Sequence, residues 1–381
     1  MSDYLPQELW LEILYWLTPK SLVICTSVCK QWKSLITDPS FISEHGSRQT
    51  NNDNQRLLVR LCRKSGSNFI ESFSLRLDDE KLDLLSPFEF PFQELFANRC
   101  SKVVGICNGL VCLADCRGHH GCDLVLWNPS IRKYVVIPTP DKTFNRLGFG
   151  FDSKNNDFKI VILSRAKGPT RVGVYSFTQG YWKIYHVESP LFNLCWMSYD
   201  TPLFNPLWDF DMSSVFLNGV LHWVVWHTCY FILTFDVAEE TFGELMLPKS
   251  LSETKYAKSS VISVLGGGPS LVTVESSVPL SSKQWFNIWV MNEYGDVGSW
   301  TKVFSYESGI AIGINCNLSR PLCFRNCGEV LLQNPSGEII ATDPVTEKEK
   351  SLGIKGDGFA FAGYQVESLV LLDKKTNVLS Y

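Results

Sequence analysis

Five potential metal ligands lie close together in this chain, and their types and spacing are the strongest hint of chemistry. They are Cys112, Cys116, His119, His120 and Cys122. Thiolates and imidazoles suit zinc, but structural zinc sites typically present Cys-x-x-Cys pairs, and this group contains none. The intervening Arg117 to Gly121 is typical of a loop between two strands. We therefore predict no metal site and no cofactor.

Other patterns that could support catalysis fit structural roles better. A phosphate-binding loop needs Gly-Lys-Ser/Thr before a helix, whereas Gly266-Gly267-Gly268 is followed by Pro269 and a strand-like segment. His222 could act as a general base, but it lies in an alternating segment without an evident nucleophile. We predict that it is a packed or hydrogen-bonded structural histidine. Glu239-Glu240 is typical of a solvated turn. None of these patterns therefore provides an evident catalytic site.

The composition narrows the class of protein. The chain has 381 residues, of which 45% are apolar, enough for a large core, and its net charge of −4 argues against a nucleic-acid-binding face. We expect no signal peptide after Met1-Ser2-Asp3-Tyr4 and no membrane span, since no apolar run approaches about 18 residues. The 13 cysteines follow no framework spacing. We therefore expect reduced thiols and a location in the cytoplasm or nucleus.

The first 45 residues carry a helical pattern that the rest of the chain lacks. Leu9, Ile13 and Leu17 recur at every fourth position, as on one face of a helix. Thr18-Pro19 is typical of an N-cap followed by proline in the first turn, so a second helix is expected there. Asp38-Pro39 is expected to stop the helical run. We predict three short helices, too small a unit to bury all of its apolar surface.

A set of positions in this stretch carries a family resemblance. The set is Leu5-Pro6, Glu12-Ile13-Leu14, Leu17, Pro19, Ser21-Leu22, Val28-Cys29-Lys30, Trp32, Ile36 and Phe41. It resembles an F-box, a module that docks on a Skp-type adaptor inside a cullin-based (SCF) ubiquitin ligase. The resemblance implies that a subset of residues contacts the adaptor or supports that contact: Leu5, Pro6, Leu9, Ile13, Leu14, Leu17, Leu22, Val28 and Trp32.

Beyond a polar stretch at 46–55, which we predict to be a linker, the chain repeats a unit of about four strands every 40 to 50 residues. The five copies span 103–138, 147–186, 214–248, 260–304 and 310–352. Four-stranded repeats of this period predict a β-propeller over 56–381. The hairpin at 57–77 and the last strands, at 359–372, are expected to share one further blade and close the ring. This reasoning predicts six blades, with seven as the alternative because 82–97 is hard to assign.

The repeats also carry a second resemblance. Its motifs are Val104 to Leu113, Leu126 to Lys133, Phe149 to Asp152, Asp157 to Val161 and Asn218 to Trp223. They resemble the F-box-associated domain of plant F-box proteins, a kelch-like propeller. The expected fold is therefore mainly β with a small N-terminal α domain: a three-helix F-box at 1–45, then the propeller.

An aromatic stretch at 192–210 is the candidate for partner recognition in the propeller. Its candidate residues are Trp196, Tyr199, Phe204 and Trp208. Aromatic side chains on a long loop are typical interface anchors. The alternative is that they fill gaps between the third and fourth blades.

The resemblances imply a non-catalytic substrate receptor. The F-box would bind the Skp-type adaptor, and through it a cullin ligase, and the propeller would hold an unknown protein substrate for ubiquitination and degradation. Three alternatives stay open: a small-molecule receptor or an enzyme with a helical cap, or a non-degradative scaffold. Substrate, pathway and oligomeric state do not follow from the sequence.

Overall fold

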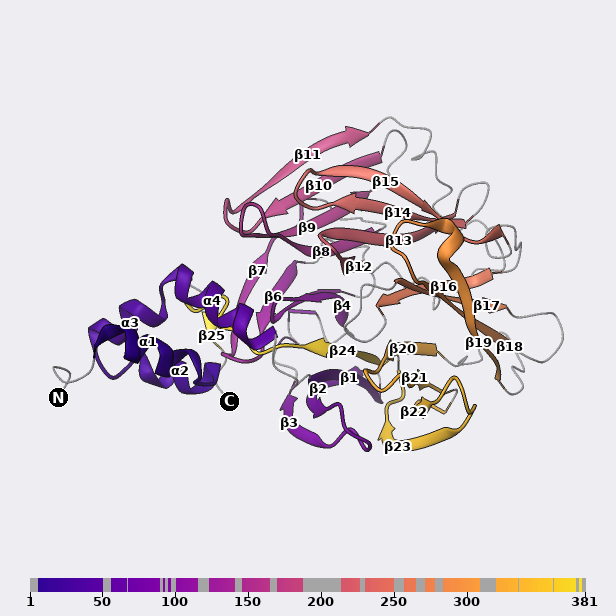
Figure 1. Ribbon diagram of the computed structural model, residues 1–381, viewed down its shortest axis with the longest axis horizontal. Helices are drawn as coiled ribbons and strands as arrows, with labels where there is room; N and C mark the ends of the chain where they lie inside the picture. Colours follow the sequence, from indigo (N-terminus) through magenta and orange to yellow (C-terminus); the bar gives the residue numbers. More distant parts are fainter. Residues whose placement is uncertain are drawn as a thin grey trace.

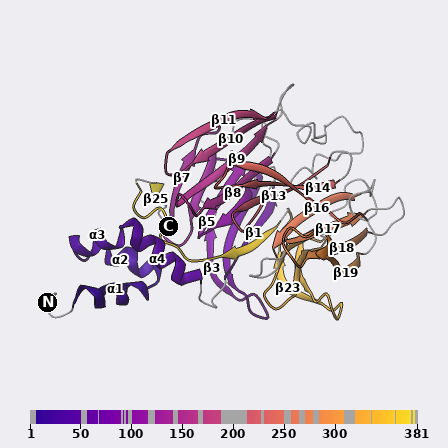
Figure 2. The same ribbon diagram turned by 45° about the horizontal axis from the view of Figure 1, so that its top comes forward.

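The computed structural model has four helices at the N-terminus and antiparallel strands after them. It describes residues 6–50, 56–66, 68–89, 92, 95–96, 101–115, 123–140, 146–164, 170–187, 214–226, 230–249, 257–264, 271–277, 284–308, 320–334, 336–358, 360–374 and 377–378. The helices lie together at one end of the molecule, and the C-terminal strand β25 lies beside them (Figures 1 and 2).

The helical head contains one helix more than expected. Its helices are α1 (Gln7–Tyr15), α2 (Pro19–Cys25), α3 (Lys30–Ile36) and α4 (Pro39–Thr50). The second helix begins as predicted: the Thr18 side chain accepts a hydrogen bond from the Ser21 backbone N–H at 3.3 Å, and Pro19 lies in the first turn. The Cys29 sulfur caps α3 in the same way, accepting from the Trp32 N–H at 3.4 Å.

The prediction that Asp38-Pro39 stops the helical run was wrong in one respect, because the pair also begins α4. The Asp38 carboxylate accepts a hydrogen bond from the Ser40 backbone N–H at 2.8 Å. Proline needs no N–H partner in a first turn, so the same dipeptide that ends one helix can start the next. Since α4 runs to Thr50, residues 46–50 of the predicted linker are helical, and 51–55 lie outside the described residues.

The described strands form six antiparallel sheets. The first contains β24 (Phe361–Gln365), β1 (Arg56–Ser65), β2 (Asn68–Leu77) and β3 (Leu84–Glu89). The second contains β4 (Ser101–Cys107), β5 (Leu110–Asp115), β6 (Leu124–Asn128), β7 (Lys133–Ile137) and β25 (Asn377–Val378). The third contains β8 (Arg146–Asp152), β9 (Asp157–Ser164), β10 (Thr170–Ser176) and β11 (Tyr181–Val187).

The remaining three sheets follow the same plan. The fourth contains β12 (Val215–Leu217), β13 (Val220–Trp226), β14 (Tyr230–Asp236) and β15 (Thr241–Met246). The fifth contains β16 (Ala257–Val264), β17 (Leu271–Ser277), β18 (Gln284–Met291) and β19 (Trp300–Ser308), with the 3-10 helix η3 (Val297–Ser299) before its last strand. The sixth contains β20 (Arg320–Phe324), β21 (Val330–Gln333), β22 (Glu338–Thr342) and β23 (Glu349–Lys355). Each of the five predicted repeats corresponds to one sheet.

The ring closes as predicted, by pairing the two ends of the propeller. Strand β24 pairs with β1 from Arg56↔Gln365 to Arg60↔Phe361. The segment that resisted assignment contains β3, the last strand of this same sheet. The predicted blade count of six, with seven as the alternative, is corrected: among the described residues five sheets have the four strands of a regular blade, and the second has five because β25 adds to the edge of β7.

Tight turns with left-handed backbone join the strands at one end of the sheets. Between β4 and β5, Asn108 and Gly109 have φ values of 45° and 80°, and Asn218 and Gly219 repeat this between β12 and β13 with 53° and 79°. Asparagine and glycine tolerate positive φ, and two such residues match the twist of a β-hairpin. These short turns leave the sheets free to pack face to face.

Large aromatic side chains join neighbouring sheets. Trp127 of β6 is fully buried and meets Phe73, Phe88 and Phe92 edge-on, with ring centroids 5.4, 6.0 and 5.9 Å away. Edge-to-face contacts of this kind add to the free energy of apolar burial. The first and second sheets are therefore held together by one aromatic cluster.

The head packs against the propeller through a shared core. Leu14, Leu22, Ile36, Phe41 and Ile42 of the head belong to one buried apolar cluster with Leu110, Leu126, Phe149 and Leu371 of the propeller. The segment after β24 reinforces this junction: the Asn128 carboxamide donates to the Ser368 and Val370 carbonyls at 3.0 and 2.8 Å. The head is thus attached by apolar packing, and these hydrogen bonds hold the segment after β24 against β6 beside it.

Candidate functional site

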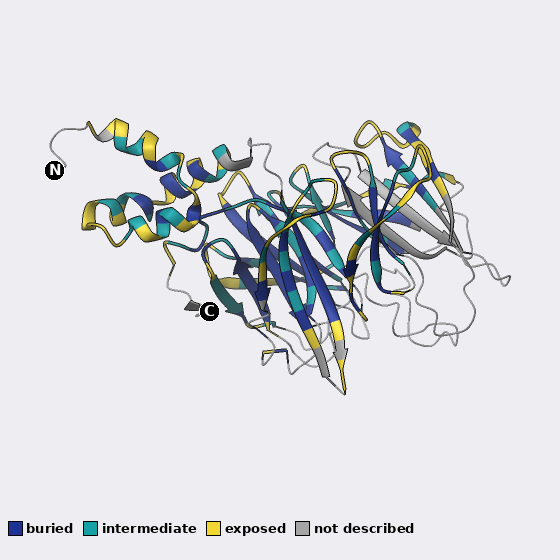
Figure 3. Cartoon of the chain, turned by 90° about the horizontal axis from the view of Figure 1, so that it is seen from below, coloured by how far each residue is buried: buried dark blue, intermediate teal, exposed yellow. Residues whose placement is uncertain are grey.

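The head presents large apolar side chains to solvent. On α1 and its C-cap, Leu9, Ile13 and Trp16 are 49%, 53% and 77% exposed, and their spacing places them on one helix face. Ile24 of α2 and Val28 of the turn after it are each 63% exposed. We call these five residues the exposed apolar face. Figure 3 shows exposed residues along the outer side of the helices. Such surface in a small unit is typical of an interaction site.

The structure divides the predicted adaptor residues into two groups. Leu9, Ile13 and Val28 are exposed, as is Pro6, whereas Leu14 and Leu22 are 1% and 0% exposed and hold the helices together. Leu17 and Trp32 are half-buried, and Leu5 lies outside the described residues. Trp16 and Ile24 were missed, although Trp16 continues the spacing of Leu9 and Ile13.

An ion-pair network holds α1 against α4 and so orients the exposed apolar face. Arg48 of α4 donates to both carboxylate oxygens of Glu12 at 3.0 and 3.2 Å, and to Glu44 at 3.0 Å. Its guanidinium also lies over the Tyr15 ring, 4.2 Å from the centroid. The hydrogen bond from Arg48 lowers the pKa of Glu12 below its usual value. Because this side of α1 is occupied by α4, the side with Leu9 and Ile13 faces outward.

A buried histidine secures the end of α1 from the inside. His45 of α4 has no exposed surface, and its Nε2 lies 2.9 Å from the Leu17 carbonyl oxygen. Burial lowers the pKa of His45. The neutral ring can donate to this carbonyl, which belongs to the short link between α1 and α2.

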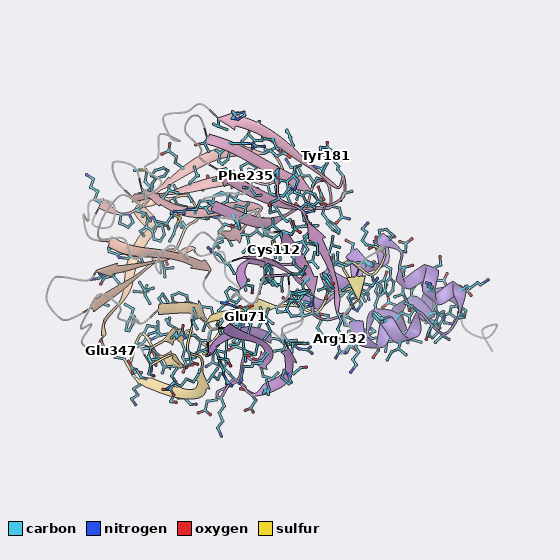
Figure 4. The ribbon with its side chains drawn as sticks, turned by 180° about the vertical axis from the view of Figure 1, so that it is seen from behind. Glu71, Cys112, Arg132, Tyr181, Phe235 and Glu347 are labelled. Atoms are coloured by element: carbon cyan, nitrogen blue, oxygen red, sulfur yellow. The ribbon has the colours of Figure 1, made fainter. Side chains whose placement is uncertain are left out.

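Among the potential metal ligands and the glycine run singled out in the sequence, the described residues include only Cys112, and it is not placed to react. Cys112 of β5 is fully buried inside the propeller (Figure 4), and burial raises the pKa of its thiol. Cys116, His119, His120, Cys122 and the triglycine at 266–268 lie outside the described residues. Within the described ranges, no group of three or more His, Cys, Asp or Glu side chains could hold a metal ion.

His222 has the structural role that the sequence analysis predicted. It has no exposed surface; its Nδ1 lies 3.2 Å from the Val215 carbonyl oxygen and its Nε2 lies 2.7 Å from the Tyr294 hydroxyl. A ring protonated at Nδ1 can donate to the carbonyl and accept from the tyrosine. Burial lowers the pKa of His222 to about 4. This neutral histidine joins the fourth sheet to the fifth.

The cysteines depart from the expectation of reduced thiols at one position. Cys62 of β1 is disulfide-bonded. The other six cysteines in the described part of the chain are free: Cys25, Cys29, Cys107, Cys112, Cys323 and Cys327.

Two further sequence expectations concern partners of the propeller and the membrane. The aromatic candidates Trp196, Tyr199, Phe204 and Trp208 lie outside the described residues, so their role stays a prediction. Across the residues with described structure, no helix is both long and apolar enough to cross a membrane.

Fold and site together define a class of protein: a β-propeller that carries a helical head with an exposed apolar face. The F-box domain family matches residues 3–44, and the F-box associated beta propeller domain family matches residues 64–368. The chain belongs to the F-box proteins with this propeller domain, as the resemblances implied.

Curated relatives resemble the chain over nearly its whole length. The F-box protein At4g22390 of Arabidopsis thaliana is 27% identical over 96% of this chain and 90% of the relative. The F-box protein CPR1 of the same plant is 26% identical over 97% of this chain and 89% of the relative. The F-box/kelch-repeat protein At3g23880 is 26% identical over 87% of this chain and 86% of its own length. The matches to At4g22390 and CPR1 extend across both the head and the propeller of this chain.

Proposed function

We propose that this protein is the substrate-recognition subunit of a Skp–cullin–F-box ubiquitin ligase. Membership of the F-box family supports this assignment, and the exposed apolar face is the observation that carries it. Covering the exposed part of each of the five side chains would contribute about 1 kcal/mol, or roughly 5 kcal/mol before the costs of association. Trp16 is expected to contribute most, since it is the largest and the most exposed.

The proposed mechanism is one of proximity and needs no catalytic residue in this chain. The head binds the Skp-type adaptor, and the propeller holds a protein target beside the ubiquitin-charged enzyme of the complex. Holding both reactants in one complex converts a bimolecular transfer into an effectively intramolecular one. The apolar packing of the head on the propeller supports this role, because it limits how far the target strays from the enzyme. A cytoplasmic or nuclear location stays a prediction from composition.

Co-purification of the full chain with a Skp-type adaptor tests the proposal. The variant Ile13→Glu/Trp16→Glu places two charges in the exposed apolar face, and it should lose adaptor binding while keeping the wild-type circular dichroism spectrum. The control is Val345→Glu, since Val345 is 88% exposed on the turn between β22 and β23, far from the head in Figure 1. It should bind as the wild type does. Failure of the wild type to bind, or equal binding by the double variant, would refute the assignment.

A second measurement separates the ligase subunit from a non-degradative scaffold. Proteins captured by the propeller would be identified from cells expressing the full chain or the Ile13→Glu/Trp16→Glu variant. A ligase subunit predicts that captured proteins are ubiquitinated and turn over faster only with the intact head. Equal turnover in both cases would favour the scaffold.

A further inference from the structure

A pocket of about 210 Å³ lies where α4 meets the propeller. One wall comes from the head, with Ile42 of α4. The opposite wall comes from the third sheet and the turns beside it, with Phe151, Phe158 and Phe177, and Leu371 adds a third side. The Phe151 and Phe158 rings are packed on each other with centroids 4.9 Å apart, so this wall is preformed.

The polar groups around this junction pocket are neutral or already paired. Glu367 forms an ion pair with Arg56, and Asp373 pairs with Lys374 at 2.9 Å. Asn108 and Asn156 also line the pocket; both residues are exposed, and neither side chain forms a hydrogen bond to another described residue. The pocket therefore offers aromatic walls and, at its exposed edge, two asparagines whose carboxamides could hydrogen-bond a ligand, but no unpaired charge among these residues.

We propose that the junction pocket binds a small neutral ligand with an aromatic ring and one hydroxyl or similar hydrogen-bonding end. An apolar cavity of about 150 Å³ is large enough for benzene, so a pocket of this size suits about ten non-hydrogen atoms. The ring would lie against Phe151 and Phe177, and the hydroxyl would reach the carboxamide of Asn108 or Asn156. Ligand sites occur preferentially at such interfaces between structural units.

The ligand contacts the head and the propeller at once, so binding ties the orientation of one to the other. A bound state that requires both walls in place is stabilised relative to any state in which the head has moved away. The site does not rest on the proposed function, because its occupancy is measured without the adaptor.

Gly46 offers a way to fill the pocket without disturbing its walls. It lies in α4 and lines the pocket, and a Cβ placed there has no atom within 4 Å. Gly46→Phe would place a ring in the ligand volume. Gly46→Ala is the matched control: it leaves most of the volume open and should raise the melting temperature, since alanine favours helix over glycine.

Saturation-transfer NMR titrations of the full chain with benzyl alcohol, phenol and 2-naphthol test the proposal. At least one probe should bind saturably to the wild type and to Gly46→Ala, and its affinity should fall at least tenfold in Gly46→Phe. Thr178→Phe fills the pocket from the propeller side and serves if Gly46→Phe does not fold. Absence of saturable binding to the wild type, or unchanged affinity in a folded filled variant, would overturn the proposal. Neither outcome bears on adaptor binding.

Discussion

Protonation of His222 should weaken the contact between the fourth and fifth sheets as the pH falls. Burial lowers the pKa of this ring from 6.5 to about 4. Between these values the unfolded chain binds the proton more tightly than the folded chain, so the free energy of unfolding falls with falling pH. From pH 7 to pH 5 the loss due to this one group is about 2 kcal/mol, and it is complete below the folded pKa.

Two variants isolate this contribution. Neither His222→Gln nor His222→Leu can titrate, so both should lose the His222 part of the pH dependence. Gln keeps hydrogen-bonding groups near the Val215 carbonyl and the Tyr294 hydroxyl, so it should be more stable than Leu at pH 7.

The assay is urea unfolding of the full chain at pH 7, 6 and 5, followed by tryptophan fluorescence. His45, whose pKa is also lowered, contributes equally to wild type and variants and cancels in the comparison. The reasoning fails if either variant loses as much stability as the wild type between pH 7 and pH 5.

Three further substitutions test the fold that carries the site. Arg325→Met removes the charged partner of the Asp78 carboxylate, which lies 2.7 Å from the guanidinium, and leaves it the hydrogen bond from the Tyr364 hydroxyl at 2.7 Å. Urea unfolding should show a loss of about 3–5 kcal/mol, whereas a loss below about 1 kcal/mol would contradict a buried ion pair. Gly337→Ala puts a Cβ 1.9 Å from the Gly356 carbonyl oxygen at a φ of +83°. Gly328→Ala is the control, because φ there is +89° but no atom lies within 4 Å of the added Cβ. The melting temperature should fall further in Gly337→Ala, and equal losses would refute the clash. Phe41→Ala should cost about 3–5 kcal/mol of stability and lower the helical signal in circular dichroism, and an unchanged signal would argue against its place in the shared core.

Much of the architecture follows from local sequence patterns. Leu9, Ile13 and Leu17 repeat every fourth position and lie in or just after α1, and Thr18-Pro19 begins α2. The five repeats correspond to five sheets because strand, turn and strand alternate at a nearly constant period. These features depend on residues close together in the chain, so periodicity and turn chemistry are sufficient to predict them.

Which apolar side chains of the head are exposed and which are buried depended on the tertiary structure. Leu9 and Leu14 both fit an apolar helix pattern, yet Leu9 is 49% exposed and Leu14 is 1% exposed. The difference arises because packing against other helices, including α4, covers one side of α1, and Asp38-Pro39 in the sequence predicts an end to the helical run before α4. Exposure is therefore a property of the packed head, and a single helix pattern does not determine it.

Of the two pairings that involve the C-terminal strands, the sequence predicts one and not the other. The repeat pattern left a hairpin at one end and spare strands at the other, so the pairing of β1 with β24 could be predicted from the sequence. The addition of β25 to β7 could not, since a two-residue strand has no detectable period. The sequence by itself determined the F-box head, the repeats and the closure. Tertiary packing alone decided which apolar side chains face solvent and where the junction pocket forms, because both depend on surfaces far apart in the chain.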